Sequence, residues 1–180
     1  IIFALLFSSE IYASQIWKSM LLPGWGENKL GHKDRGKIFL LSEYIMWTSF
    51  MFIDDQYSSY RNDYRSHGTH YANVNWDGKN DLFAAHVGNY NSTSEYNDLT
   101  RMLSGSSEDA YDIENPNNLW DWQNDSSLRK QYDSMRNKSE QLDEFKTLMI
   151  AALAINRIAS VFDVMAISRK YGRSFSFETY

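Results

Sequence analysis

Apolar and polar positions divide the chain into two long helical segments with a polar stretch between them. The first segment runs from Arg35 to about Ser66 without proline, and its first half, residues 38–53, is apolar on nearly every face. Its second half narrows to a stripe of tyrosines at Tyr57, Tyr60 and Tyr64. This pattern predicts one long helix that is surrounded on all sides at its apolar end and amphipathic at the other end. Gly68 is its predicted C-terminal stop.

The second segment repeats this pattern in the opposite order. It begins near Ser126, with Asp125 or Ser126 as cap, and runs to about Arg169, with Gly172 behind it. Its first half is amphipathic, with Leu128, Tyr132, Met135 and Leu142 at helical spacing. Its second half, residues 145–167, is apolar almost all round. The two segments therefore predict a mainly α chain built on a long antiparallel helical hairpin, in which like halves meet.

The residues between the two segments predict an insertion. Residues 67–124 are rich in Asn, Asp, Ser and Gly, with short helices predicted at 81–87 and 95–103. No alternation persists long enough for a sheet. We expect residues 14–180 to form a single helical domain that carries this polar, partly helical insertion.

The stretch "LLPGWGENKLGHKDRGK", residues 21–37, predicts a folded glycine-rich cap at the N-terminal end of the hairpin. Its structural turn residues are Pro23, Gly24, Gly26, Gly31 and Gly36. We expect Gly26 and Gly31 to adopt positive φ and Gly36 to lie against the second helix. A phosphate-binding loop is disfavoured, because the spacing matches no P-loop and Lys33 is followed by Asp.

The N-terminus and the cysteine count bear on localisation. Residues 1–13 combine a short apolar run with a small-residue site at Ala13, as in a secretory signal peptide, and the missing basic region and initiator Met indicate that the sequence begins inside it. The alternative is a buried or anchoring helix. The chain has no cysteine, which excludes disulfides, a thiolate metal site and the lipid anchor of a bacterial lipoprotein.

Charge differs between the parts of the chain. Residues 54–144 hold 17 Asp and Glu against 8 Lys and Arg, a net charge of −9, and the remainder holds 6 against 10, a net charge of +4. The hairpin places one basic cluster at a single end: Lys29, Lys33, Arg35, Lys37, Arg169, Lys170 and Arg173. Such a cluster suits anionic headgroups, and a solvated helix end is the alternative.

Neither apolar segment is a clean transmembrane helix by sequence. Residues 38–53 are short for a span, and residues 147–167 contain Asn156, Arg157 and Asp163. If the signal peptide is cleaved, the basic end of the hairpin starts outside the cytoplasm. A hairpin that spans the membrane would then place the acidic insertion in the cytoplasm, against the positive-inside rule. We therefore expect association with a membrane surface on the periplasmic side, at the outer membrane or in the periplasm. An integral membrane protein is the alternative.

Polar residues within the apolar halves predict a buried network. Asn156, Ser160 and Asp163 share one helix face, Arg157 lies beside it, and Glu43 is the one acid in the facing apolar half. Because an unpaired buried charge is too costly to persist, we expect these five residues to pair and to fix the helix register. A proton or ion relay is the alternative.

Candidate chemistry is sparse. His67, His70 and His86, with Asp77 and Asp81 nearby, could ligate a metal, but such spacing is common in loops, and we predict neither a metal nor a cofactor. No hydrolase or dinucleotide motif occurs, so no catalytic residue is predicted.

The insertion also contains a candidate ligand surface for sugars or peptides, formed by Trp76, Trp120 and Trp122. A small aromatic core is the alternative. Nucleic acid does not suit so acidic a surface.

Two motifs carry a family resemblance. "PGWGENKLGHKDRG" resembles the PG-x-G-Q-x-Y-x-G-x-x-x-K-G opening of the DUF5683 family of uncharacterised bacterial envelope proteins, and "INRIASVFDV" resembles its closing INR-x-x-SA-x-DA element. Glu27 stands where that family has Gln, and Lys29 where it has an aromatic residue. The resemblance implies a signal peptide and a helical, membrane-associated fold without assigned activity.

These observations together predict a non-catalytic structural or interaction protein of the bacterial cell envelope. We expect it to contact an envelope protein partner through its acidic insertion. A glycan- or peptide-binding module that uses the insertion aromatics is the alternative, and an envelope hydrolase is a third. The sequence does not predict an oligomeric state.

Overall fold

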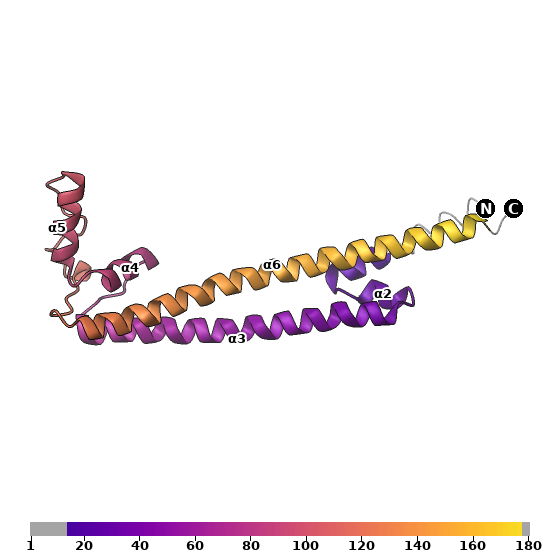
Figure 1. Cartoon of the computed structure of the whole chain (residues 1–180), viewed down its shortest axis with the longest axis horizontal. Helices are drawn as coiled ribbons and strands as arrows, with labels where there is room; N and C mark the ends of the chain where they lie inside the picture. Colours follow the sequence, from indigo (N-terminus) through magenta and orange to yellow (C-terminus); the bar gives the residue numbers. More distant parts are fainter. Residues whose placement is uncertain (1–13, 178–180) are drawn as a thin grey trace. The chain divides into compact units, whose positions relative to one another are not determined.

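The structure is a computed structural model that describes the backbone of residues 14–177 and the side chains of residues 14–170. Residues 14–21 are helical, and the other elements are α2 (Trp25–Lys29), α3 (Lys33–Ala72), α4 (Asp81–Asn89), α5 (Thr93–Ser104), the short 3₁₀ helix η1 (Pro116–Asn118) and α6 (Ser126–Phe177) (Figure 1). The described residues form no β-strand. The prediction of a mainly α chain built on a helical hairpin is confirmed. The predicted signal peptide, residues 1–13, lies outside the described residues.

Both long helices run further than predicted. Gly68 does not end α3, because a Cβ there would lie 3.0 Å from the Trp76 ring and 3.2 Å from the Tyr132 ring, so this glycine gives two aromatic rings access to the helix. The helix ends at Ala72, where Asn73 adopts a positive φ of 56°. Gly172 likewise lies inside α6, since one glycine costs a helix only about 1 kcal/mol. Both predicted stops are therefore wrong.

Side-chain caps fix the starts of the other helices. The Asp125 carboxylate accepts hydrogen bonds from the backbone N–H groups of Ser127 (2.9 Å) and Leu128 (3.1 Å), which confirms it as the cap of α6. Asn80 caps α4 and Ser92 caps α5 in the same way. The two short helices predicted in the insertion are confirmed, each to within two residues at either end.

The chain divides into two compact units. Unit 1 comprises residues 1–52 and 146–180, and unit 2 comprises residues 53–145. The boundary falls inside α3 and α6, whereas the sequence suggested one domain with its insertion at 67–124. Unit 2 thus takes in both helix halves that flank the insertion, and the division coincides with the change in net charge along the sequence.

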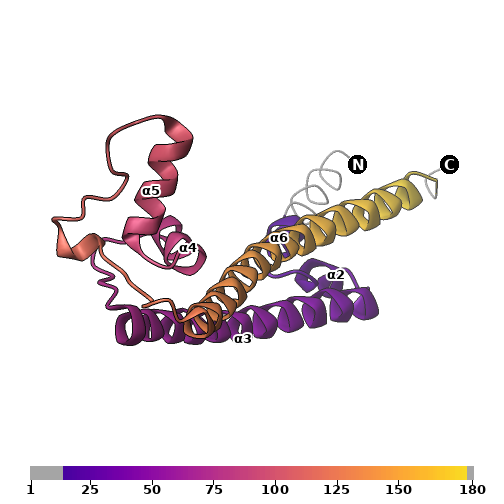
Figure 2. The same ribbon diagram turned by 60° about the vertical axis from the view of Figure 1, so that its left-hand side comes forward.

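In unit 1 the first half of α3 runs antiparallel to the second half of α6, and the cap packs against both. Figure 2 shows α2 between these two helices. The backbone N–H of Gly24 donates to Ser160 Oγ on α6 (3.0 Å), and Pro23 is fully buried. Among the described residues of this unit, the buried positions include Leu153, Val164 and Ile167 together with glycines, serines and the acids Glu27 and Glu43.

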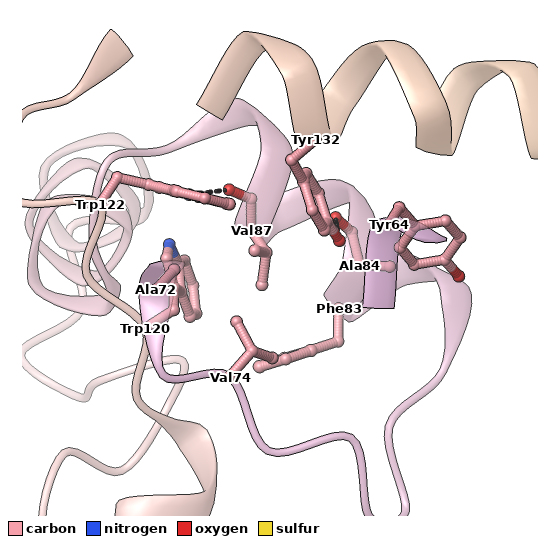
Figure 3. Close-up of a cluster of buried hydrophobic side chains, with 9 residues drawn as sticks. All are labelled: Tyr64, Ala72, Val74, Phe83, Ala84, Val87, Trp120, Trp122 and Tyr132. Carbon is pink, nitrogen blue, oxygen red and sulfur yellow. Dashed lines mark hydrogen bonds between the residues drawn. The ribbon is translucent and has the colours of Figure 1, made fainter. Parts of the chain in front are cut away.

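Unit 2 has a core of aromatic rings. Its buried cluster consists of Tyr64, Ala72, Val74, Phe83, Ala84, Val87, Trp120, Trp122 and Tyr132 (Figure 3). Tyr64 of α3 meets Tyr132 of α6 edge to face, with ring centroids 5.5 Å apart. The predicted meeting of the two amphipathic halves is therefore confirmed at this pair. The hydroxyl of Tyr132 donates to the backbone oxygen of Ala84 (2.9 Å), which ties α4 to the helix pair.

Candidate functional site

A buried carboxylate on α3 organises the polar interior of unit 1. Glu43 is 4% exposed, and its Oε1 lies 2.6 Å from Arg157 Nη2 on α6. Asn156 donates from Nδ2 to Glu43 Oε2 (3.0 Å) and to the backbone oxygen of Phe39 (3.2 Å). Trp47 adds a hydrogen bond from its indole N–H to Glu43 (3.0 Å). These contacts join the two helices at one level, as a register-fixing network requires.

The other two predicted members belong to different contacts. Asp163 pairs with Arg35 at 2.5 Å, and Ser160 donates from Oγ to Glu27 Oε1 at 2.7 Å. The predicted single network of five residues is therefore wrong. Asp163 is seven residues beyond Asn156, about 10 Å along the helix axis. That distance brings it level with the start of α3 instead of with Glu43.

Glu27 is the main residue that sequence reasoning missed. Its side chain is fully buried, and its two carboxylate oxygens accept hydrogen bonds from Ser160 and from Ser19 Oγ (2.7 Å). Ser19 in turn accepts from the backbone N–H of Gly26 (2.9 Å). The sequence carried no signal for it, because its partners Ser19 and Ser160 come from different elements. Glu27 ties the cap to α6.

The predicted turn residues shape this cap, but not all as expected. Gly24 has a φ of +91°, and a Cβ on it would lie 2.2 Å from the backbone oxygen of Gly36. Gly31 also has a positive φ, as predicted, whereas Gly26 lies in α2 and is required because Gln15 and Ser19 approach it within 2.5 Å of a Cβ position. The atoms nearest to a Cβ on Gly36 belong to Asn28 and Gly24, so the cap closes on α3 at this point.

The tryptophans of the insertion are in the core of unit 2. Trp120 and Trp122 are 2% and 1% exposed, and their indole N–H groups donate to the backbone oxygens of Tyr90 (3.1 Å) and Val87 (2.8 Å). Trp76 is half-buried and donates to the backbone oxygen of Arg65 (2.9 Å). The predicted ligand surface is therefore wrong, because the aromatic side chains of the insertion form the core of unit 2.

The histidines of unit 2 make contacts that hold the fold. His67 Nε2 lies 3.0 Å from the backbone oxygen of Leu128, and His86 Nδ1 lies 2.7 Å from the Tyr111 hydroxyl. Burial lowers the pKa of His86 and raises that of Tyr111 to about 12. Within residues 14–170 no group of three His, Cys, Asp or Glu side chains is placed to hold a metal ion.

Unit 2 also contains a charged cavity of about 230 Å³. It is lined by Tyr57, Arg61, Tyr64, Asp81, Ala84, Arg136, Ser139, Glu140, Asp143 and Glu144. The side chain of Arg136 is 8% exposed, and its guanidinium pairs with Asp133 (2.7 Å) and Glu140 (2.5 Å). Burial alone would lower the pKa of Arg136, but these carboxylates raise it above its ordinary value. The charged groups of the cavity wall thus already neutralise one another in part.

The described part of unit 1 exposes many large apolar side chains. We define the apolar belt as its large exposed apolar side chains on α3 and α6, each 41–66% exposed: Ile38, Leu41, Tyr44, Ile45, Trp47, Met51, Phe52, Leu148, Ile150, Ile155, Ile158 and Phe162. Trp17, Met20, Leu21, Leu22 and Trp25 extend this surface over the cap. Within the described residues α6 contains one stretch long and apolar enough to cross a membrane.

The basic cluster lies in unit 1, beside one end of the apolar belt. Arg35 is 57% exposed and reaches Asp163, which sets the start of α3 level with the later turns of α6. Lys29, Lys33, Lys37, Arg169 and Lys170 are exposed. The side chain of Arg173 lies outside the described residues.

No family model, curated protein or solved structure matches this chain. The resemblance to the DUF5683 family stays a prediction that rests on the two motifs.

Proposed function

We propose that this chain is a non-catalytic structural or interaction protein of the bacterial cell envelope. Unit 1 associates it with a membrane, and the acidic unit 2 contacts an envelope protein on the periplasmic side. One observation supports the proposal: the described part of unit 1 exposes large apolar side chains along both long helices and buries Glu27 and Glu43. Unit 2 buries most of its aromatic rings and exposes many acids, together with single apolar side chains such as Met102 and Leu103.

The acidic face of the insertion supports contact with a basic partner. Residues 54–144 have a net charge of −9, and the segment between α5 and η1 exposes Glu108, Asp112 and Glu114 around Ile113, which is 50% exposed. Acids around an apolar residue suit a protein surface that is basic with an apolar contact at its centre. The glycan-binding alternative is not proposed, because the indoles of Trp120 and Trp122 are in the core.

The test is a photo-crosslinking experiment in isolated bacterial membranes. A benzophenone amino acid replaces Ile113, and we expect a discrete adduct after illumination of the membrane fraction. The double variant Glu108→Gln/Glu114→Gln should weaken the adduct, and Glu108→Lys/Glu114→Lys should abolish it, because attraction becomes repulsion. An adduct that is equally strong in all three chains would contradict contact through the acidic face, and recovery of the protein in the soluble fraction would contradict membrane association.

A further inference from the structure

Several polar side chains in the apolar segments of unit 1 have partners inside the protein, although Asp163 Oδ2 is buried without a hydrogen-bond partner. Thr48 donates from its hydroxyl to the backbone oxygens of Tyr44 (3.0 Å) and Ile45 (2.9 Å) within its own helix. Trp47 and Asn156 both donate to Glu43. Polar groups in hydrocarbon must find partners inside the protein, whereas on a surface facing water such partners are unnecessary.

Charges within the same segments are also paired. Residues 38–53 and 147–167 contain three charged side chains, Glu43, Arg157 and Asp163. Glu43 pairs with Arg157 at 2.6 Å, and Asp163 pairs with Arg35 at 2.5 Å. An isolated charge at the centre of a bilayer costs about 2.5–3.5 kcal/mol on insertion scales, and pairing across the two helices reduces that cost. The sequence-based objection to a span, the presence of these charges, is thereby answered by the geometry.

The distance between the charged borders fits a bilayer. On α3 the apolar stretch lies between Lys37 and Asp54, and on α6 it lies between Lys146 and Arg169. At about 1.5 Å per residue these stretches measure about 26 Å and 35 Å, against a hydrocarbon core of about 30 Å. Tilt accommodates the longer stretch, and adjustment of the bilayer accommodates the shorter one.

We propose that α3 and α6 cross a lipid bilayer as an integral hairpin, with the apolar belt facing the acyl chains and the basic cluster on the cytoplasmic side. This inference rests on the proposed membrane association and replaces surface attachment by insertion. The orientation follows from the seven Lys and Arg of the basic cluster at the cap end of both helices, against Lys146 at the other border. It is opposite to the orientation that cleavage of a signal peptide after residue 13 would impose.

The absence of cysteine makes a direct topology test available. Lys29→Cys in the cap and Lys130→Cys in unit 2 each replace an exposed lysine, so the two variants are matched in charge and exposure. Spheroplasts are treated with a membrane-impermeant maleimide, before and after lysis. We expect Lys130→Cys to react in intact spheroplasts and Lys29→Cys to react only after lysis. The unmodified chain supplies a second measurement, since protease added outside should cleave unit 2 and leave the cap protected.

The other outcomes overturn the inference in distinguishable ways. If both cysteines react before lysis while the protein sediments with the membranes and is released from them by carbonate, the hairpin lies on one face, and the proposed membrane association still stands. If Lys29→Cys alone reacts, or neither does, the proposed crossing with the basic cluster inside is wrong. A water-soluble oligomer would mean that a second copy covers the apolar belt, and both this inference and the membrane association would then fail.

Discussion

The two units use the same pair of helices to solve opposite packing problems. In unit 2, α3 and α6 meet through Tyr64 and Tyr132, and these two rings pack in one buried cluster with the aromatic rings of the insertion. In unit 1 the same helices meet through Glu43 and Arg157 and turn their large apolar side chains outward. The hydrophobic effect explains why unit 2 buries its aromatic rings. It does not explain why unit 1 exposes large apolar side chains, if water surrounds that unit. The comparison teaches that one pair of helices can pack around aromatic rings in one unit and around a buried ion pair in the other.

Different substitutions should therefore be damaging in the two units, and the largest effect should come from the core of unit 2. Trp122→Ala removes a ring that is 1% exposed and its hydrogen bond to Val87, and should lower the free energy of unfolding by about 4 kcal/mol. Urea unfolding in detergent, followed by near-ultraviolet circular dichroism, measures it.

The matched control lies in unit 1. Trp17 is 65% exposed, so Trp17→Ala should change the free energy of unfolding by less than about 0.5 kcal/mol. Equal losses for the two alanine variants would remove the contrast between an aromatic interior and an aromatic exterior.

The ion pair of unit 1 should show the second largest effect. Arg157→Met leaves Glu43 buried without its cation, and should cost about 3 kcal/mol of unfolding free energy. The double variant Arg157→Met/Glu43→Leu removes both charges and should return to within about 1 kcal/mol of the parent chain. Thermal unfolding of all three chains in detergent measures the coupling. If the double variant loses the sum of the single losses, the two side chains do not act as a pair.

Periodicity predicted the helices and their antiparallel pairing because long apolar and amphipathic stripes dominate the pattern. It did not predict where they end, since Gly68 serves the approach of Trp76 and Tyr132 instead of stopping the helix. The sequence placed Glu43 and Arg157 together correctly because few charges occur in the apolar halves. It could not place Glu27, whose partners Ser19 and Ser160 come from different elements and share no spacing with it.

The cap offers a more moderate test of unit 1. Gly24→Ala introduces a Cβ at positive φ that lies 2.2 Å from the backbone oxygen of Gly36, and should cost at least about 2 kcal/mol. Gly31→Ala has a similar φ of +85° with no atom within 4 Å, and should cost about 1 kcal/mol from backbone strain alone. The difference in melting temperature between the two variants isolates the close approach of the cap to α3. Identical losses would show that this approach contributes nothing to stability.

The smallest effect should be a pH dependence confined to unit 2. His86 stacks on Tyr96 with ring centroids 4.2 Å apart, and burial lowers its pKa from the ordinary value of about 6.5. The folded state therefore favours the neutral ring, so stability is fully present above pH 6.5 and falls as the pH drops through the folded pKa. Urea midpoints between pH 7.5 and 5.0 should decline modestly in the parent chain.

Two variants assign this decline to one side chain. His86→Gln cannot take up a proton in this range, so its urea midpoint should decline less than that of the parent chain. His70 is exposed on α3, and His70→Gln should leave the decline unchanged. If His70→Gln flattens the curve and His86→Gln does not, the acid sensitivity of unit 2 originates outside its aromatic core. The expected result would mean that a proton on His86 destabilises the packed rings of unit 2. In unit 1, by contrast, the charged pair of Glu43 and Arg157 is part of the interior.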